Sequence, residues 1–490
     1  MIAALLLVPT IAGISVLLVR RDLLRRVLLI AAAATQFALT VATWLKPVAA
    51  EGAGWLALDD LARLFLTITS SLFLAAAVYA VGYLKREGSR LPHNPYDATN
   101  INEPDAVFMA CLLLFLATMT LMIVSRRFGL IWVAMEATTL TSAPLIYFHR
   151  SQRSLEATWK YLLICSVGIA LALLGTLFLA VAATSASRHS LPLLVDILIR
   201  PESALQPVWL KAAFIFLLVG YGTKMGLVPL HTWLPDAHSE APSVVSGLLS
   251  GALLNCALLG IVRVHQVCAA HGLGRFSGDL LVLFGLLSMA VAGVFIAGQA
   301  DFKRMLAYSS VEHMGILALG IGAGGAAVSG ALFHALNHSM AKTLLFFAAG
   351  NIIAAYATKK TREVTGLIHA APRTGVLWLV GCAAIVGMPP FSTFLSEFSI
   401  LKALIEQGRV AASVVYLAAL ALVFVGMAII MVRMALGAPP ARLKHEPLAD
   451  SWLVTLPPVV LGIVLLVLGV YVPPAVQVFL SRAAHLLGGR

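Results

Sequence analysis

The sequence predicts an all-α polytopic membrane protein with about fourteen transmembrane helices. Of its 490 residues, 60% are hydrophobic and only 11% are charged, whereas a soluble protein of this size carries about 25% charged residues. The mean hydropathy is +0.94. Apolar windows of membrane length also recur along the whole chain. These properties argue against a soluble enzyme and against a nucleic-acid-binding domain.

The candidate spans follow from the lengths of the apolar runs, because a bilayer core needs about 20 apolar residues per helix. The windows that qualify are 2–19, 24–44, 60–83, 106–124, 128–148, 157–183, 208–230, 242–264, 279–299, 305–323, 327–356, 375–401, 411–434 and 452–472. The first window has no basic region before it and no clear cleavage site after it. We therefore interpret it as a retained first helix and not as a signal peptide.

Basic residues give the expected orientation in the cell (inner) membrane. They follow spans 1, 3, 5, 9, 11 and 13, which all end on one side, and the positive-inside rule makes that side cytoplasmic. Both termini are then expected outside the cytoplasm. Arg126 and Arg127, in a short external loop, are an exception. The cytoplasmic set is Arg20, Arg21, Arg25, Arg26, Lys85, Arg86, Arg90, Arg150, Arg153, Lys303, Arg304, Lys359, Lys360, Arg362, Arg442 and Lys444.

The cysteines do not indicate a cofactor site. They form no CxxC pair, so neither a zinc site nor an iron–sulfur ligand set is predicted. Glycine-rich pieces such as GIGAGG at 320–325 lack the lysine and the strand of a phosphate-binding loop. We expect no cofactor on this chain. The five cysteines are Cys111, Cys165, Cys256, Cys268 and Cys382.

Two spans contain proline breaks. The seventh ends in LVPLHTWLP, with Pro229 and Pro235, and the twelfth contains VGMPPFSTFLSEF, with Pro389 and Pro390. Breaks at membrane depth are tolerated where the freed backbone faces protein or a wet cavity. Because five spans separate the two, they hold corresponding positions in helices 4–8 and 9–13. Paired breaks of this kind are typical of inverted repeats around a midplane site.

This pattern divides the chain into four parts. Residues 1–104 hold three helices and a polar loop, 105–268 the first inverted five-helix repeat and 269–436 the second, and 437–490 a C-terminal helix. Each repeat is expected to form a half-channel.

Ionisable residues inside predicted spans are functional candidates, because each is costly in a bilayer. They are Glu136, Lys224, His334, His338, Lys342 and Glu397, with His231 beside the first break. The span-eleven residues follow an i, i+4, i+8 spacing, which places them on one helix face. Water between such side chains would let protons pass along the stripe. Glu312 and His313, in span ten, are further inward-facing candidates.

A structural interpretation exists for each of these residues. A membrane histidine often serves packing through a hydrogen bond, and a lone glutamate can pair with a lysine for assembly only. Near span ends we favour the interpretation that a lysine or arginine extends to the lipid headgroups. That interpretation applies to Lys160, Lys211, Lys402 and Arg433.

Four motifs identify a family resemblance. HTWLPDAHSEAPS, FKRMLAYSSVEHMG, HALNHSMAKTLLFFAAGN and GMPPFSTFLSEF resemble the proton-translocating antiporter-like family. That family includes the M, N and L type subunits of complex I, Mrp antiporter subunits and membrane subunits of energy-converting hydrogenases. The resemblance covers about residues 105–435. The sequences of the motifs are most similar to those of hydrogenase-4 component F and formate-hydrogenlyase membrane subunits.

The resemblance implies fourteen helices, two inverted repeats, broken helices 7 and 12, and a hydrated axis of Glu, Lys and His. By motif position it implies that Glu136 and Lys224 form the pair of helices 5 and 7, and that Glu397 is the terminal residue of helix 12. Separation of that pair would expel a proton toward the axis. His334, His338 and Lys342 match the helix-11 group. Asn255 departs from the pattern, because many M-type members carry a lysine there; an asparagine orders water but carries no charge.

Three functions remain open at this stage. The first is a proton-translocating subunit of a complex I-like or hydrogenase-4-like oxidoreductase, whose iron–sulfur, NiFe or flavin groups sit on partner subunits. The partners would be other antiporter-like membrane subunits and peripheral redox subunits. The second is an Mrp-type Na⁺ or K⁺/proton antiporter subunit. The third is a structural subunit with a degenerate channel, motivated by Asn255.

Overall fold

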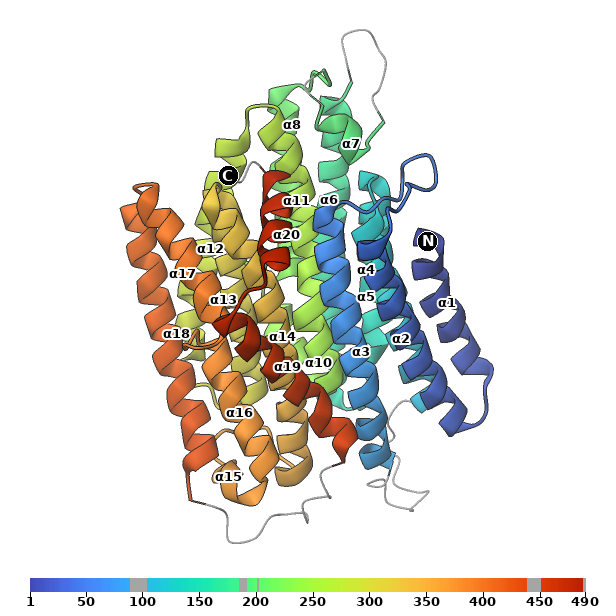
Figure 1. Ribbon diagram of the computed structural model, residues 1–490, viewed down its shortest axis with the longest axis vertical. Coiled ribbons are helices and arrows are strands. Elements are labelled where there is room, and N and C mark those ends of the chain that lie inside the picture. The colour runs from blue at the N-terminus through green and yellow to red at the C-terminus, as the bar shows by residue number, and fades with distance from the viewer. Residues whose placement is uncertain (89–103, 185–191, 201, 439–450, 488–490) are drawn as a thin grey trace.

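A computed structural model describes residues 1–88, 104–184, 192–200, 202–438 and 451–487 (Figure 1). Within these ranges the regular structure is helical, with only isolated β-bridges between loops. The elements of the first half are α1 (Ile2–Leu18), α2 (Asp22–Leu45), α3 (Asp60–Gly88), α4 (Asp105–Val124), α5 (Phe128–Ile146), α6 (Gln152–Ala182), α7 (Val195–Leu198), α8 (Pro207–Met225), α9 (Trp233–Glu240), α10 (Ser243–Leu248), the π-helix η1 (Leu249–Leu253) and α11 (Leu254–Ala270).

The second half begins at the turn after α11. Its elements are α12 (Gly274–Ile296), α13 (Phe302–Ala323), α14 (Ala326–Tyr356), α15 (Leu367–Ala370), α16 (Pro372–Ile385), α17 (Ser392–Glu406), α18 (Val410–Leu436), α19 (Trp452–Val470) and α20 (Pro474–His485).

Each of the fourteen predicted spans coincides with a helix or with a broken helix pair in the described ranges. Eleven helices are long and apolar enough to cross a membrane by themselves. The remaining three spans are α1, α13 and the pair α16–α17. Of these, α13 carries charged residues and α16–α17 is interrupted, which explains why neither resembles a simple apolar span. The all-α polytopic prediction is confirmed.

Both predicted breaks are present, one between α8 and α9 and one between α16 and α17. At each, the chain reaches a glycine with positive φ, Gly226 at +82° and Gly387 at +67°, a conformation that favours glycine. Three residues later each break contains a cis X-Pro peptide bond, at Pro229 and at Pro390. The residues run GLVPLHTW over 226–233 and GMPPFSTF over 387–394. The two breaks therefore share one local pattern.

Pro235 does not take part in the break, contrary to the prediction. It lies inside α9, which begins at Trp233. A proline is tolerated in the first helical turn because the missing N–H has no intrahelical acceptor there. The interruption thus ends before Pro235, and α9 continues as a short second half of broken helix 7.

One helix was not predicted. α20 follows α19 after three residues and packs against α14 and α3. It has only 12 residues and one apolar side, so no window of membrane length covers it. Gln266 Nε2, on α11, donates to the Leu486 carbonyl at 2.9 Å, which ties the residues after α20 to the first half.

The two ends of the bundle differ in composition. α1 begins at the upper end of Figure 1, and α15 lies at the lower end. At the lower end, Arg86 Nη1 of α3 donates to Asn351 Oδ1 of α14 at 3.1 Å. Lys359, just after α14, pairs with Glu240 of α9 at 2.8 Å. We call this the basic end, because the loops predicted to be cytoplasmic meet there.

The exceptional arginines at the opposite end are held by partners. Arg126 Nη1 donates to Asp59 Oδ2 at 2.7 Å, and Arg263 of α11 binds both Asp59 oxygens at 2.6 and 2.8 Å. Asp196 also pairs with Arg126. Arg127 lies 4.2 Å from the centroid of the Trp55 ring. These contacts explain why two arginines are tolerated outside the basic end.

Candidate functional site

Lys224 occupies the last turn of α8 and is fully buried. Its amine donates to the Thr139 hydroxyl at 2.7 Å and to the Tyr161 hydroxyl at 2.6 Å. It also lies 4.5 Å from the centroid of the Tyr161 ring. The Tyr161 hydroxyl shares a further hydrogen bond with Ser142 Oγ at 2.6 Å. Helices α5 and α6 therefore surround a buried amine with neutral oxygens and one aromatic face.

Glu136 lies one turn from Thr139 on α5 but does not form the predicted ion pair with Lys224. Its Oε1 accepts from Ser166 Oγ at 2.9 Å. Its Oε2 is buried without a hydrogen-bond partner among the described residues. The carboxylate and the amine interact electrostatically, yet no carboxylate oxygen in the described ranges lies within 4.0 Å of Lys224 Nζ. The hydroxyls of Thr139 and Tyr161 occupy the positions nearest the amine instead.

Close packing of α6 against α8 places Tyr161 beside the amine. A Cβ on Gly168 would lie 2.7 Å from Thr223 Cβ, so only a glycine permits this approach. Trp233, the first residue of α9, donates from Nε1 to the Thr223 carbonyl at 2.8 Å. Its ring lies 5.0 Å from that of Tyr161. The break in helix 7 therefore brings an indole to a carbonyl at the helix end and completes the wall of the lysine site.

The second half contains the predicted stripe on α14. His334, His338 and Lys342 are all fully buried. The rings of His334 and His338 have centroids 6.5 Å apart and stack at an interplanar angle of 17°. The i, i+4, i+8 spacing thus places the three side chains on one buried face, as predicted.

His313, on α13, joins this stripe. Its ring centroid lies 5.1 Å from that of His334 and 5.0 Å from that of His338. His313 Nδ1 and His334 Nε2 are hydrogen-bonded at 2.9 Å. His334 Nδ1 bonds Ser396 Oγ of α17 at 3.0 Å. Three helices therefore contribute to one chain of hydrogen-bonding groups.

Glu397 brings a carboxylate to the same place. One ring nitrogen of His313, one ring nitrogen of His334 and one carboxylate oxygen of Glu397 all lie within 4.8 Å of one another. The carboxylate packs against the break, since a Cβ on Gly387 would lie 2.1 Å from Glu397 Oε2. The glycine at the end of α16 is thus required both for its backbone conformation and for the space that the carboxylate occupies.

Lys342 lies at the other end of the stripe. Its amine donates to the Leu306 carbonyl at 2.8 Å and interacts electrostatically with Glu312. Glu312 is buried on α13, and its Oε2 lies 3.6 Å from His313 Nε2. Glu312 also interacts electrostatically with Glu397. Lys342, Glu312, the histidines and Glu397 are therefore neighbours. Among the described residues the direct hydrogen bonds within this group join His313 to His334 and His334 to Ser396.

Asn255 lies between the two halves. Its Nδ2 donates to Ser339 Oγ of α14 at 2.7 Å and to the Gly251 carbonyl at 2.8 Å. Ser339 directly follows His338 and lies one turn before Lys342. Cys256, the next residue on α11, interacts electrostatically with Lys224. A neutral amide thus stands between the lysine of the first half and the stripe of the second.

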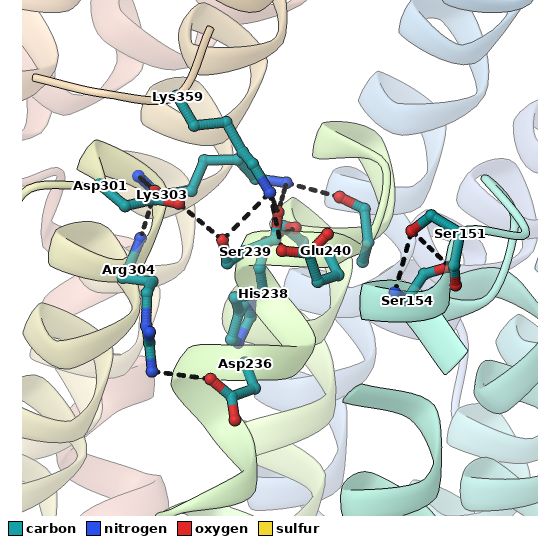
Figure 2. A network of polar contacts seen from close by, with 12 residues as sticks. Ser151, Ser154, Asp236, His238, Ser239, Glu240, Asp301, Lys303, Arg304 and Lys359 are labelled. Carbon is teal, nitrogen blue, oxygen red and sulfur yellow. Dashed lines mark hydrogen bonds and ion pairs between the residues drawn. The ribbon is translucent and has the colours of Figure 1, made fainter. Parts of the chain in front are cut away.

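The remaining polar residues of the first motif lie toward the basic end. The His231 ring is 6.1 Å from the Tyr308 ring, and its Nδ1 has no partner among the described residues. Asp236 binds Lys160 at 3.0 Å and Arg304 at 2.7 Å, and Figure 2 shows the Arg304 contact. His238 is fully buried above this ion pair. His231 therefore lies outside the hydrogen-bonded contacts of Lys224.

Several residues of the site are not predicted by the sequence. Thr139, Tyr161 and Ser142 carry no charge, so an inspection for ionisable residues passes over them. Their spacing relative to Lys224 is set by tertiary packing alone. The sequence predicts Glu312 and His313 only as inward-facing residues, from their position in the motif AYSSVEHMG.

Comparison with known proteins places this arrangement in a family. Residues 125–424 match the family described as NADH:quinone oxidoreductase/Mrp antiporter, TM. The chain belongs to this family. A hydrogenase-4 component F homolog of Methylacidiphilum infernorum is 34% identical over 446 residues, which is 88% of each chain. Hydrogenase-4 component B of Escherichia coli is 30% identical over 376 residues; the match covers 74% of this chain and 53% of component B.

Chains of three solved membrane complexes share the fold. A chain of the archaeal membrane-bound sulfane sulfur reductase superposes with a TM-score of 0.84 at 21% identity, covering 100% of this chain and 98% of the other. A chain of the Mrp complex from Dietzia sp. gives 0.83 at 22% identity, over 99% and 97%. A chain of respiratory complex I from Thermus thermophilus gives 0.80 at 22% identity, over 100% of both.

These relatives are membrane subunits of multi-subunit complexes. The chain is accordingly an integral, multi-pass, antiporter-like membrane subunit, and the relationship to hydrogenase-4 component F agrees with the resemblance of the motifs.

Proposed function

We propose that this antiporter-like subunit moves protons through the membrane and is driven by redox chemistry on partner subunits. The observation that carries the proposal is a line of buried polar groups. It is formed by the group around Lys224, the Asn255–Ser339 hydrogen bond at 2.7 Å, and the group of Lys342, the histidines and Glu397. Ionisable groups inside a membrane are costly and rare. A packing role needs neither six of them nor their proximity to one another inside the bundle.

The geometry at Lys224 supports a switching role. Within the described ranges the groups hydrogen-bonded to the buried amine are neutral, while the Glu136 carboxylate stays on Ser166. A small rearrangement of α5 against α8 would bring the carboxylate to the amine and stabilise its charge. The return movement would remove that stabilisation and favour release of the proton toward Asn255. Alternation between these two contacts is a two-state element that a partner subunit can drive.

The redox groups are proposed to sit on partners. This proposal is supported by the sequence, in which the five cysteines are scattered and form no CxxC pair. We propose peripheral subunits with iron–sulfur clusters and a NiFe or flavin centre, and neighbouring antiporter-like subunits in the same complex. Relatives named as hydrogenase-4 components support a hydrogenase-linked complex.

The orientation follows from the charges. We propose that the chain lies in the inner membrane with its basic end toward the cytoplasm and both termini outside. The loops at the basic end carry lysines and arginines with exposed side chains, such as Lys360. The arginines at the opposite end are held by Asp59 and Asp196.

A second function is favoured by one observation, the TM-score of 0.83 with a chain of an Mrp complex. In that case the chain would be part of an Mrp-type Na⁺ or K⁺/proton antiporter. Cation sites of that kind prefer several oxygen ligands, whereas this line is built largely from lysine and histidine nitrogens.

The test begins with the composition of the native complex. The tagged protein is purified in mild detergent, and its partners are identified by mass spectrometry. We expect a hydrogenase-like large subunit and iron–sulfur proteins. Recovery of antiporter subunits alone, together with Na⁺-stimulated transport by the purified assembly, would reject redox-driven proton transfer in favour of the Mrp-type function.

A further inference from the structure

A polar cavity of about 440 Å³ opens at the basic end, between α3, α14 and the residues that join α9 to α10. Charged groups on its wall come from several elements. They include Arg86, Glu87, His149, Glu240, Lys303 and Lys359. Charged side chains are more stable in contact with water than in an apolar environment. A cavity of this size with such a lining therefore admits water. It is therefore a place where protons from the aqueous phase can reach the protein.

The inner wall of this cavity is a network of hydrogen bonds around Ser239 (Figure 2). Ser239 Oγ donates to Asp301 Oδ2 at 2.8 Å. The Lys303 amine donates to the Ser239 carbonyl at 3.3 Å, and the Lys359 amine donates to the same carbonyl at 3.0 Å. Two lysines thus converge on the backbone at the end of α9 and fix it between α13 and α14.

His238 lies directly behind this wall. Its side chain is fully buried, and neither ring nitrogen has a hydrogen-bond partner among the described residues. The ring stacks on Phe346 of α14 with centroids 5.2 Å apart and an interplanar angle of 13°. A buried imidazole with both nitrogens available is unusual, since buried polar atoms are normally satisfied by protein or by ordered water. His338, in the stripe, shares this feature, and a role in packing leaves it unexplained in both.

The helix register places His238 between the cavity and the stripe. Phe346 follows Lys342 by four residues on α14, so the His238 ring is about one turn from the lysine. On α13, Leu306 follows Lys303 by three residues, and its carbonyl accepts from the Lys342 amine at 2.8 Å. Both amines, Lys303 on the cavity wall and Lys342 on the stripe, interact electrostatically with the His238 ring.

We propose that His238 takes up protons from the basic-end cavity and passes them to Lys342, so that the second half has its own entrance. The inference rests on the proposed function and adds the place of proton uptake. An excess proton, carried into the cavity as hydronium, binds one ring nitrogen and leaves neutral water behind. The other nitrogen donates its proton to the neutral Lys342 amine, and exchange of the tautomer restores the starting state. No other reactant is needed.

The experiment uses the complete assembly in proteoliposomes, with redox turnover and proton movement measured together. In His238→Ala, proton movement per turnover falls by roughly 10²-fold, the lower end of the effect of removing a proton-transfer group. Imidazole added on the side of the basic end restores most of it, because the deleted ring leaves a space of its own size beside Phe346. A purely structural role predicts no rescue.

His265→Ala is the matched control. His265 is also a buried histidine, but its Nδ1 bonds Ser277 Oγ at 2.8 Å and it lies outside the line. The His265→Ala assembly should move protons at the parent rate and show no response to imidazole. If His238→Ala fails to assemble, His238→Gln keeps a polar side chain that cannot carry the charge, and the same loss is expected without rescue.

The outcomes separate the two proposals. If the parent assembly moves no protons, or if Lys224→Ala changes nothing, the proposed function itself fails. If Lys224→Ala abolishes proton movement while both His238 variants move protons at the parent rate, the proposed function stands and the entrance at His238 is rejected.

Discussion

The Lys224 amine lies 2.6 Å from the Tyr161 hydroxyl and makes no ion pair with Glu136. This relationship captures one of two states in the proposed cycle, because the buried amine is held by neutral oxygens while its carboxylate partner is bound to Ser166. The coupling of redox turnover to proton movement then depends on the exchange of the Lys224 contact between Tyr161 and Glu136.

Removal of the amine should separate redox turnover from proton movement. In Lys224→Ala we expect the assembly to oxidise and reduce its substrates while proton movement falls by roughly 10²-fold or more. The measurement is the membrane potential formed by proteoliposomes during turnover. Lys211→Ala is the control, since this exposed lysine at the other end of α8 lies over Phe276 at 5.5 Å and outside the line. Equal loss in both variants would contradict a specific role for Lys224.

Tyr161→Phe tests the hydroxyl without removing the ring. The amine keeps its aromatic face and Thr139 but loses an acceptor at 2.6 Å. Loss of one hydrogen bond to a charged group costs about 1.5–3 kcal/mol, so we expect proton movement to be roughly 10- to 100-fold slower, with little change in assembly. Steady-state proton uptake checks this. An unchanged rate would show that Tyr161 only packs against the lysine.

Asn255→Leu should disconnect the two halves. The leucine removes the amide that donates to Ser339 at 2.7 Å and fills the space between Lys224 and the stripe with apolar atoms. We predict that proton movement is lost while the complex assembles and turns over. Asn255→Gln, which keeps an amide, should retain part of the activity. Full coupling in the leucine variant would mean that protons do not cross at this position.

Gly387→Ala tests the space that Glu397 occupies. The new Cβ would lie 2.1 Å from Glu397 Oε2, so the carboxylate must move away from the histidines. Gly408→Ala is a matched control: its φ is +71°, similar to the +67° of Gly387, but no atom lies within 4 Å of a Cβ there. In both variants an alanine must adopt a positive φ, which destabilises the folded protein to a similar extent. Only Gly387→Ala should lower proton movement, as measured in proteoliposomes.

The ion cluster at the opposite end predicts a pH dependence of stability. Burial alone would raise the pKa of Asp59, but the guanidiniums of Arg263 and Arg126 hold it well below its usual range. Because the folded pKa is lower than the unfolded value of about 3.9, the stabilisation is complete above that value and is lost as the pH falls below it.

Asp59→Asn removes this contribution and leaves Arg263, 1% exposed, without its carboxylate. We expect a loss of about 3 kcal/mol, seen as a lower unfolding temperature in detergent at pH 7 and a smaller difference from the parent at acid pH. Asp60→Asn, which removes the partly exposed partner of Arg63, should change little. A difference that grows as the pH falls would have the wrong sign.

The sequence was sufficient for the helices and for the positions of the buried charges. Hydropathy located all fourteen spans, and the i, i+4, i+8 spacing correctly placed His334, His338 and Lys342 on one face. The sequence does not predict which side chains of different helices are in contact. Nothing local indicates that Tyr161 would lie beside Lys224, because that contact depends on the approach of α6 to α8 at Gly168.

The errors have physical causes as well. Pro235 was predicted to break helix 7, but a proline in the first turn of α9 interrupts nothing. α20 was missed because it is too short for a membrane-length window. Arg126 departs from the charge rule because Asp59 and Asp196 neutralise it, and these contacts are set by the fold.

The most direct test of the central claim is the number of protons moved per electron pair by the purified assembly, compared between the parent and Glu397→Gln. The glutamine has nearly the same shape but cannot carry a proton as a charge. We predict measurable proton movement in the parent and its loss in the variant, with redox turnover continuing in both. An identical proton-to-electron ratio in the two would contradict proton transfer along this buried line.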